Sequence, residues 1–416
     1  GALEEAGVNP DALSHSSEQL AGKIDTLKKK QGEAADKAMT FGDKAGQAFN
    51  QVHEAIVAAG IAVALKEIYE YFASCAQASM DFESAITGVA KTTDLTDEEL
   101  AAMSDSIKAL STEIPATTEE IAAVAEAAGQ LGIQKDALLD FTEIMTMLGT
   151  ATNMTADEAA TSLARFANIT GMATDNYGRL GSVIVDLGNN FATTESEIVA
   201  MGTRLASAGK LAGLTEPEIM ALAAAMSSVG IEAEAGGTAM TQTLNAIEKA
   251  VAKGGDDLAE FARIAGMSSE EFSSAWKNDA MSALTSFIGG LGKLDEQGES
   301  TVLVLEDLGL TGIRQSNMLK ALGLAADQMT GAVNTANTAW QQNTALTNDA
   351  NKRYATAQSR LTMMQNAYNN LKVAIGDAYT PALSEAYGVG TKVLNSITAF
   401  IQKNPALVNA ITAFAG

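Results

Sequence analysis

The residues best placed to carry chemistry form a GLTG loop, Gly309–Gly312, between two leucine-bearing helical patterns. A helix–GxxG–helix unit is how KH domains hold a nucleic-acid backbone. Such a surface needs Lys and Arg, but the chain has 51 acidic against 27 basic residues and a formal net charge of −24. A KH domain also needs a sheet, and the sequence has no convincing period-two alternation. The loop is therefore predicted to be a corner between two helices, and no specific nucleic-acid binding is expected.

Residue types that serve catalysis or metal binding are few. The two histidines, His15 and His53, stand apart from other ligands, and neither HExxH nor CxxC occurs. Cys75 lies in the context YFASCAQAS and is predicted to be a small buried residue. The GGDD sequence at 254–257 is interpreted as a turn and helix cap, and most carboxylates fall at predicted helix starts. We therefore expect no metal, no cofactor and no enzymatic activity.

Two features concern the ends of the chain and its compartment. A single cysteine cannot form an internal disulfide, so an oxidised secreted scaffold is not expected. The chain begins at Gly1 without Met or a signal-peptide pattern, and its last residues, from Ala406, are nearly all apolar. We expect a piece of a longer protein, in which residues 386–416 start a hydrophobic segment.

Residues 1–54 carry a seam in which steps of four and three alternate, the spacing of a heptad repeat. Two interpretations remain open: an Ala-rich coiled coil with partner chains, or one amphipathic helix against a core. Residues 55–79 are predicted to form an apolar helix or linker. It opens with Ala55–Leu65, about half the ~20 residues that a membrane-spanning helix needs, which favours a buried helix. The seam consists of Leu20, Ile24, Leu27, Gln31, Ala34, Ala38, Phe41, Ala45, Ala48 and Val52.

Helix start signals recur from Thr96 onward. A Ser or Thr three residues before a Glu can form a capping box, in which each side chain bonds the other residue's backbone N–H. Glycines at the ends of the apolar runs are interpreted as helix stops: Gly129, Gly149, Gly230 and Gly266. Together these signals predict an all-α fold of many short helices. The boxes are Thr96–Glu99, Thr117–Glu120, Thr155–Glu158, Thr194–Glu197, Thr215–Glu218 and Ser268–Glu271.

The sequence also contains an internal duplication. Residues 116–170 and 192–250 both start with ATTE and read as helix–turn–helix–turn–helix, so two similar helical units are predicted to pack side by side. The alignment pairs Gly132 with Gly213, Gly149 with Gly230 and Leu163 with Leu244.

A change in composition follows Trp340, beyond which Gln, Asn, Thr and Ala dominate. One long helix is predicted over about 336–376, ended by Pro381. Its narrow apolar stripe keeps steps of three and four and consists of Leu361, Met364, Tyr368, Leu371 and Ile375.

The most specific segments read MSSEEFSSAWKNDAMSALTSFIGGLGKL and, in the corner at 305–322, LEDLGLTGIRQSNMLKAL. With MDFESAITGVAKTTDL before them and AYTPAL after them, they resemble the core of bacteriophage tail tape measure proteins, including those of prophages and tail-like particles. The resemblance runs from about Met80 to Leu383, within a core domain of residues 80–385. One departure is Ala280–Met281, where the family has a proline before the next helix. The motif residues are Phe272, Trp276, Asp279, Gly309, Gly312 and Arg314.

The resemblance implies a structural protein that lies in the lumen of the tail tube, sets its length, templates its assembly and is expelled at infection. It also implies assembly in the host cytoplasm as a homo-oligomer, with tail tube protein, tail assembly chaperones and baseplate or tail-tip proteins as partners. Contact with the host membrane at infection stays open. Two other classes remain: a secreted helical toxin or translocator that inserts into membranes, and a generic helical scaffold.

Within the corner at 305–322, two expectations concern single residues. Gly309 is predicted to end one helix with a positive φ, and Gly312 to let the next helix begin close by. Arg314 is expected to bond Glu306, Asp307 or the carbonyls that end the preceding helix.

Overall fold

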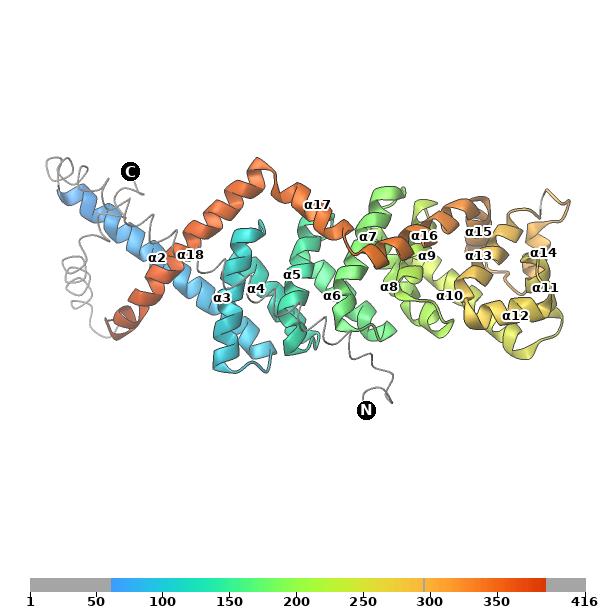
Figure 1. Cartoon of the computed structure of the whole chain (residues 1–416), viewed down its shortest axis with the longest axis horizontal. Helices are drawn as coiled ribbons and strands as arrows, with labels where there is room; N and C mark the ends of the chain where they lie inside the picture. Colours follow the sequence, from blue (N-terminus) through green and yellow to red (C-terminus); the bar gives the residue numbers. More distant parts are fainter. Residues whose placement is uncertain (1–60, 295, 387–416) are drawn as a thin grey trace. The chain divides into compact units, whose positions relative to one another are not determined.

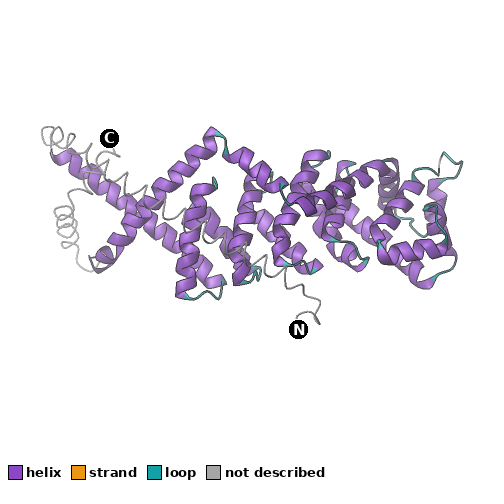
Figure 2. Ribbon diagram, in the orientation of Figure 1, coloured by secondary structure: helices purple, strands orange, loops and turns teal. Residues whose placement is uncertain are grey.

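The computed structural model describes residues 61–294 and 296–386, which contain seventeen α-helices, one short 3-10 helix and no strand (Figure 2). The predicted all-α fold is therefore confirmed. The segment at 1–54 and the hydrophobic run beyond residue 386 lie outside the described residues, as does most of Ala55–Leu65. None of the helices in the described ranges is long and apolar enough to span a bilayer.

The helices follow one another with short links (Figure 1). The first nine elements are α2 (Ile61–Thr92), α3 (Asp97–Glu113), α4 (Thr118–Gln130), α5 (Lys135–Ala151), α6 (Ala156–Thr170), η1 (Thr174–Asn176), α7 (Tyr177–Asn190), α8 (Glu195–Leu211) and α9 (Glu216–Ser228). The others are α10 (Ala233–Lys253), α11 (Asp256–Ile264), α12 (Ser269–Asn278), α13 (Ala280–Leu291), α14 (Thr301–Asp307), α15 (Ile313–Leu324), α16 (Ala326–Gln342), α17 (Ala345–Tyr354) and α18 (Ala357–Ala386).

The described residues divide into two compact units, one within residues 81–371 and one that combines residues 61–80 with 372–386. In the second unit, Ser79 Oγ donates a 2.6 Å hydrogen bond to Asp377 Oδ1. Cys75 is 1% exposed there, as the sequence predicts, and burial raises the pKa of its thiol. The α18 backbone stays helical through position 381, so the predicted break at Pro381 is wrong; proline removes one helical hydrogen bond, but here the helix tolerates that loss.

All six predicted capping boxes form. In the first, the Glu99 carboxylate accepts from the Thr96 backbone N–H at 2.9 Å, and Thr96 Oγ1 accepts from the Glu99 N–H. A 2.6 Å hydrogen bond from Lys135, together with the Thr96 N–H, lowers the pKa of Glu99 to about 2. The start signals were readable from the sequence because each box lies within four residues.

Of the four glycines predicted to end helices, two do so and two do not. Gly230 and Gly266 have φ of 79° and 72° and follow the ends of α9 and α11, as predicted. Gly129 and Gly149 instead lie inside α4 and α5. A Cβ on Gly129 would lie 2.6 Å from Thr92 Oγ1, and one on Gly149 would lie 2.7 Å from the Ala156 nitrogen, so both permit close packing rather than ending a helix.

Both segments of the predicted duplication fold as three consecutive helices, α4–α6 and α8–α10, and α6 packs against α8. Gly132 and Gly213 end the first helix of each with φ of 79° and 85°. The second pairing differs, since Gly149 is helical while Gly230 is left-handed. The duplication therefore stays a prediction. The centre of the larger unit is α9, in which residues 219–226 are all buried beneath α7, α8 and α16.

The single long helix expected over about 336–376 is wrong: this region forms α16, α17 and the first part of α18 (Figure 1). Asn343 ends α16 in the left-handed conformation, with φ of 50°. Its side-chain oxygen accepts from Ser182 Oγ at 3.2 Å, and the Arg179 guanidinium donates to the Trp340 carbonyl at 2.8 Å. These contacts with α7 fix the turn, so that α16 packs on α7 and α9 while α17 packs on α5 and α7.

Candidate functional site

Phe272 and Trp276 lie on α12 within an aromatic cluster. The Phe272 ring centroid is 6.3 Å from that of Phe261 on α11 and 6.5 Å from that of Trp276, and Phe261 is 5.0 Å from Phe287 on α13. All four side chains are at most 3% exposed. Aromatic burial of this kind gives a large hydrophobic contribution to stability. The motif aromatics are therefore core residues that join three short helices.

Polar groups at the C-terminal end of α12 are hydrogen-bonded as well. Trp276 Nε1 donates a 2.7 Å hydrogen bond to Glu248 on α10, which fixes the indole against the neighbouring helix. Asp279 ends α12 and caps α13, since its carboxylate accepts from the Ser282 N–H at 3.0 Å. Helix α13 begins at Ala280 without the proline of the family, and the Asp279 cap stabilises this start.

Two close approaches of helix backbones hold this region together. A Cβ on Gly290 of α13 would overlap the carbonyl oxygen of Ile264 at the end of α11. A Cβ on Gly292 would overlap the carbonyl oxygen of Gly323 near the end of α15. Neither position needs a positive φ, so the requirement for glycine is one of space. Gly290 lies within the segment MSSEEFSSAWKNDAMSALTSFIGGLGKL, whose family resemblance was the only sequence signal for it.

The corner at 305–322 joins α14 to α15. Gly309 has φ of 71°; its N–H bonds the Glu306 carbonyl at 2.9 Å and the next N–H bonds the Leu305 carbonyl at 2.8 Å, which is a Schellman motif. Gly312 is the N-cap of α15. The positive φ predicted for Gly309 and the helix start predicted at Gly312 are confirmed, as is the corner between two helices. A KH domain would need a sheet, and no strand lies among the described residues.

The expected contact of Arg314 is wrong. This side chain is exposed and forms no hydrogen bond or ion pair with any residue in the described ranges, because it lies on the outer face of the first turn of α15. Its neighbour Gln315 is 5% exposed instead, and its Nε2 donates to Thr243 Oγ1 of α10 at 3.1 Å. The polar link between the corner and α10 is thus made by an amide, one position further along.

One charged link was missed in the sequence. The Arg263 guanidinium bonds both carboxylate oxygens of Glu299 at 3.0 and 2.8 Å and both of Glu260 at 3.0 and 2.8 Å. The pKa of Glu260 is lowered, chiefly by the hydrogen bonds from Arg263. Glu260 lies one helical turn before Arg263, but Glu299 is 36 residues away, and no local pattern indicates that pairing.

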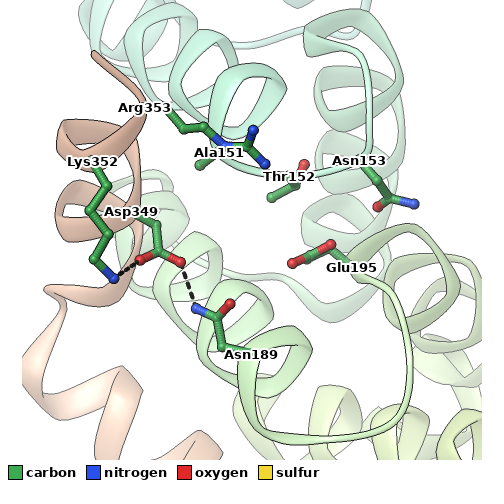
Figure 3. A pocket seen from close by; sticks show the side chains of 8 residues that line it. All are labelled: Ala151, Thr152, Asn153, Asn189, Glu195, Asp349, Lys352 and Arg353. Carbon is green, nitrogen blue, oxygen red and sulfur yellow. Dashed lines mark hydrogen bonds and ion pairs between the residues drawn. The ribbon is translucent and has the colours of Figure 1, made fainter. Parts of the chain in front are cut away.

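A polar cavity of about 410 Å³ lies where α5, α7, α8 and α17 meet (Figure 3). Asp349 Oδ1 bonds Lys352 at 2.5 Å and Oδ2 accepts from Asn189 at 2.6 Å. Burial raises the pKa of Asp349, but the hydrogen bonds from Lys352 and Asn189 outweigh it and the net shift is downward. The lining residues are Ala151, Thr152, Asn153, Asn189, Glu195, Asp349, Lys352 and Arg353.

The cavity wall contributes to structure. Asn153, after α5, donates to Ser196 Oγ at 2.8 Å and accepts from the Ser196 N–H at 3.1 Å, so it bonds the first turn of α8. In the described part of the chain, no group of three or more His, Cys, Asp or Glu side chains could hold a metal ion. The arrangement joins helices, and one of its two lining carboxylates, Asp349, is bonded by Lys352 and Asn189.

Residues 104–308 match the family model described as "Phage-related minor tail protein", over just under half of the chain. The match begins within α3 and ends at the C-terminus of α14, so it includes Phe272, Trp276 and Asp279 and stops directly before Gly309. No curated protein and no solved structure is significantly similar to the chain. The family match supports a structural role in a phage tail, and with it a location in the virion tail.

Proposed function

We propose that this chain is a tape measure protein, which sets the length of a phage tail tube. The observation that carries the proposal is the match of residues 104–308 to a phage minor tail family, together with the resemblance of the surrounding segments to tape measure cores. In this role the protein has no enzymatic activity. It assembles as a homo-oligomer inside the tube, with tail tube protein, tail chaperones and baseplate proteins as its partners, and it leaves the tube at infection.

The physical basis of a ruler is the fixed rise of a helix. At about 1.5 Å per residue, a continuous helix of the whole chain would extend roughly 620 Å. The described residues form short helices that fold back on one another, so the ruler state requires the tertiary contacts between helices to open. An acidic chain suits a channel through which DNA later passes, because it does not bind phosphates strongly.

The test is a change of length in the parent gene. A deletion inside the described helices would also remove tertiary contacts. Residues 341–370, for example, include α17, which packs on α5 and α7, and Asn366, which bonds α3. Residues 21–48 comprise four heptads of the predicted seam. Their in-frame deletion is expected to shorten tails by about 42 Å, measured on negatively stained particles.

The matched control replaces residues 21–48 with four heptads of unrelated sequence and the same apolar spacing, and it should restore the original tail length. A second copy of the four heptads should lengthen tails by the same amount. Tails of unchanged length in the deletion and duplication variants would reject the ruler and leave a tail component of another kind. Shortening in the replacement variant as well would show that sequence, and not length, matters.

A further inference from the structure

Helices α16, α17 and the first part of α18 run back along the larger unit, in the reverse order of the helices that they contact. α16 packs on α9 and α7, and α17 packs on α7 and α5. Farther along, Asn366 of α18 donates hydrogen bonds to the carbonyls of Ser111 at 2.8 Å and Ala116 at 2.7 Å, at the end of α3 and just after it. These three attachments span the helices from α9 to α3. Those helices can therefore move apart only after one of the attachments has opened.

Little of α17 is buried. Among its ten residues, Leu346 and Ala350 are buried, whereas α16 buries Met329 and three alanines. The links on both sides of α17, residues 341–344 and 355–358, are exposed at every position. Regions with few buried apolar contacts open at lower free energy than the rest of a protein. A short helix between two exposed links can leave its neighbours without moving the helices before and after it.

Two polar cavities interrupt the contact of α17 with its neighbours. The cavity of about 410 Å³ in Figure 3 and a second of about 220 Å³, which α7, α16 and α17 line, share the residues Asn189, Asp349 and Lys352. Close packing in protein interiors leaves few spaces larger than a water molecule. Helix α17 is instead held at separate points, chiefly by buried Leu346 and by the 2.6 Å hydrogen bond from Asn189 to Asp349.

Two groups at this interface oppose the attachment. Burial raises the pKa of Asp186 on α7, the hydrogen bond from Asn190 opposes this shift, and the nearby charge of Asp349 on α17 raises the pKa further. At the end of α17, the Tyr354 hydroxyl is buried without a hydrogen-bond partner among the described residues. Like charges at short range and a buried hydroxyl without a partner both cost free energy. Movement of α17 into water would remove both costs.

We propose that α17 is a release helix: residues 345–354 leave α5 and α7 as one unit, while α16 stays on α9 and α18 stays on α3. Once released, residues 343–356 can extend over as much as about 45 Å, against about 15 Å for the intact helix. The helices near α3 and those near α9 then stay tethered but are no longer held together by this part of the chain. Use of the release as an early step toward the ruler state rests on the tape measure proposal, whereas the release itself does not.

The test is hydrogen exchange of the full 416-residue chain at neutral pH, followed by mass spectrometry. Amides of α17 are expected to exchange at least tenfold faster than those of α16. Asn189→Ala removes the bond to Asp349 and should speed exchange in α17 at least threefold, with no change in α16. The matched control is Asn190→Ala, because this neighbouring, equally exposed amide bonds Asp186 of its own helix and should leave exchange in α17 unchanged.

Two further variants should act in the opposite direction. Tyr354→Phe removes the buried hydroxyl and Asp186→Asn removes the like charge, so each should slow exchange in α17 at least twofold without changing α16. Three outcomes would overturn the release helix: α17 exchanging no faster than α16, Asn189→Ala speeding both helices equally, or neither opposing variant slowing α17. None of them bears on the tail-length test, and tails of unchanged length in the heptad variants would leave the release of α17 standing.

Discussion

Two regions of the larger unit are held together by different physics. The motif helices, residues 256–324, are joined by buried aromatic rings and by backbones that meet at Gly290 and Gly292. The strap, residues 345–371, comprises α17 and the first part of α18 and is anchored mainly by side-chain amides. Its buried apolar side chains are few, chiefly Leu346 and Ala350 of α17.

The difference shows how composition determines the mode of attachment. A region with Phe, Trp and Gly can bring helices into close contact and exclude water, so its stability is cooperative and tolerates little change of volume. A region rich in Asn, Gln, Thr and Ala attaches through hydrogen bonds, each of which contributes only about 1 kcal/mol net. We therefore expect the strap to open at lower free energy than the motif helices.

The largest expected effect is that of Gly290→Ala. The added methyl group overlaps the Ile264 carbonyl, and since backbone cannot turn aside, we expect a loss of about 3 kcal/mol in the free energy of unfolding, measured by urea denaturation. The control is Gly289→Ala, whose methyl group would meet only Ala326 Cβ at 3.8 Å. This variant should be neutral or slightly more stable. Equal losses in both would show that the motif helices do not depend on the close approach.

A smaller effect is expected in the strap. Asn366→Ala leaves two buried carbonyls without donors and should cost about 1–3 kcal/mol, with faster hydrogen exchange confined to α18 and the end of α3. Asn369→Ala serves as the control, because that side chain makes no hydrogen bond with a residue in the described ranges. If exchange in α11–α13 accelerated equally, the two regions would be one cooperative unit and the comparison would fail.

The smallest expected effect is on stability at low pH. Glu271 is the carboxylate of the capping box at the start of α12, and its pKa is lowered by hydrogen bonds from Ser268, chiefly that of the backbone N–H and secondly that of the side chain. Because the folded pKa lies below the unfolded value of 4.5, this contribution is complete above that value and is lost as pH falls through the folded pKa. Helices α16 and α17 have no such box at their N-termini. Acid should therefore weaken α12 before these two helices.

Glu271→Gln checks this, since the amide oxygen can still accept from Ser268 but does not titrate. The fall of the thermal midpoint between pH 5 and pH 2 should be shallower in the variant than in the wild type. Glu270→Gln, outside the box, should keep the wild-type slope. A wild-type slope in both variants would mean that the box adds no pH dependence.

The sequence by itself determined the helical fold, the six capping boxes and the Schellman corner at Gly309, because each depends on residues no more than five positions apart. It also indicated that Cys75 is buried. These features follow from local hydrogen bonding and local hydrophobicity, which do not need the rest of the chain.

Only the tertiary structure decided which glycines allow close packing and that Gln315, not Arg314, bonds α10. It also divided residues 336–376 among α16, α17 and α18 in place of one long helix. It left Leu361, Met364 and Leu371 of α18 exposed as well, while the amides of Asn366 and Asn370 bond carbonyl groups near the end of α3. The physical reason is that, apart from the contact of Gly149 with Ala156, these contacts join residues tens to hundreds of positions apart. Helical periodicity records which side chains share a face but not what that face meets.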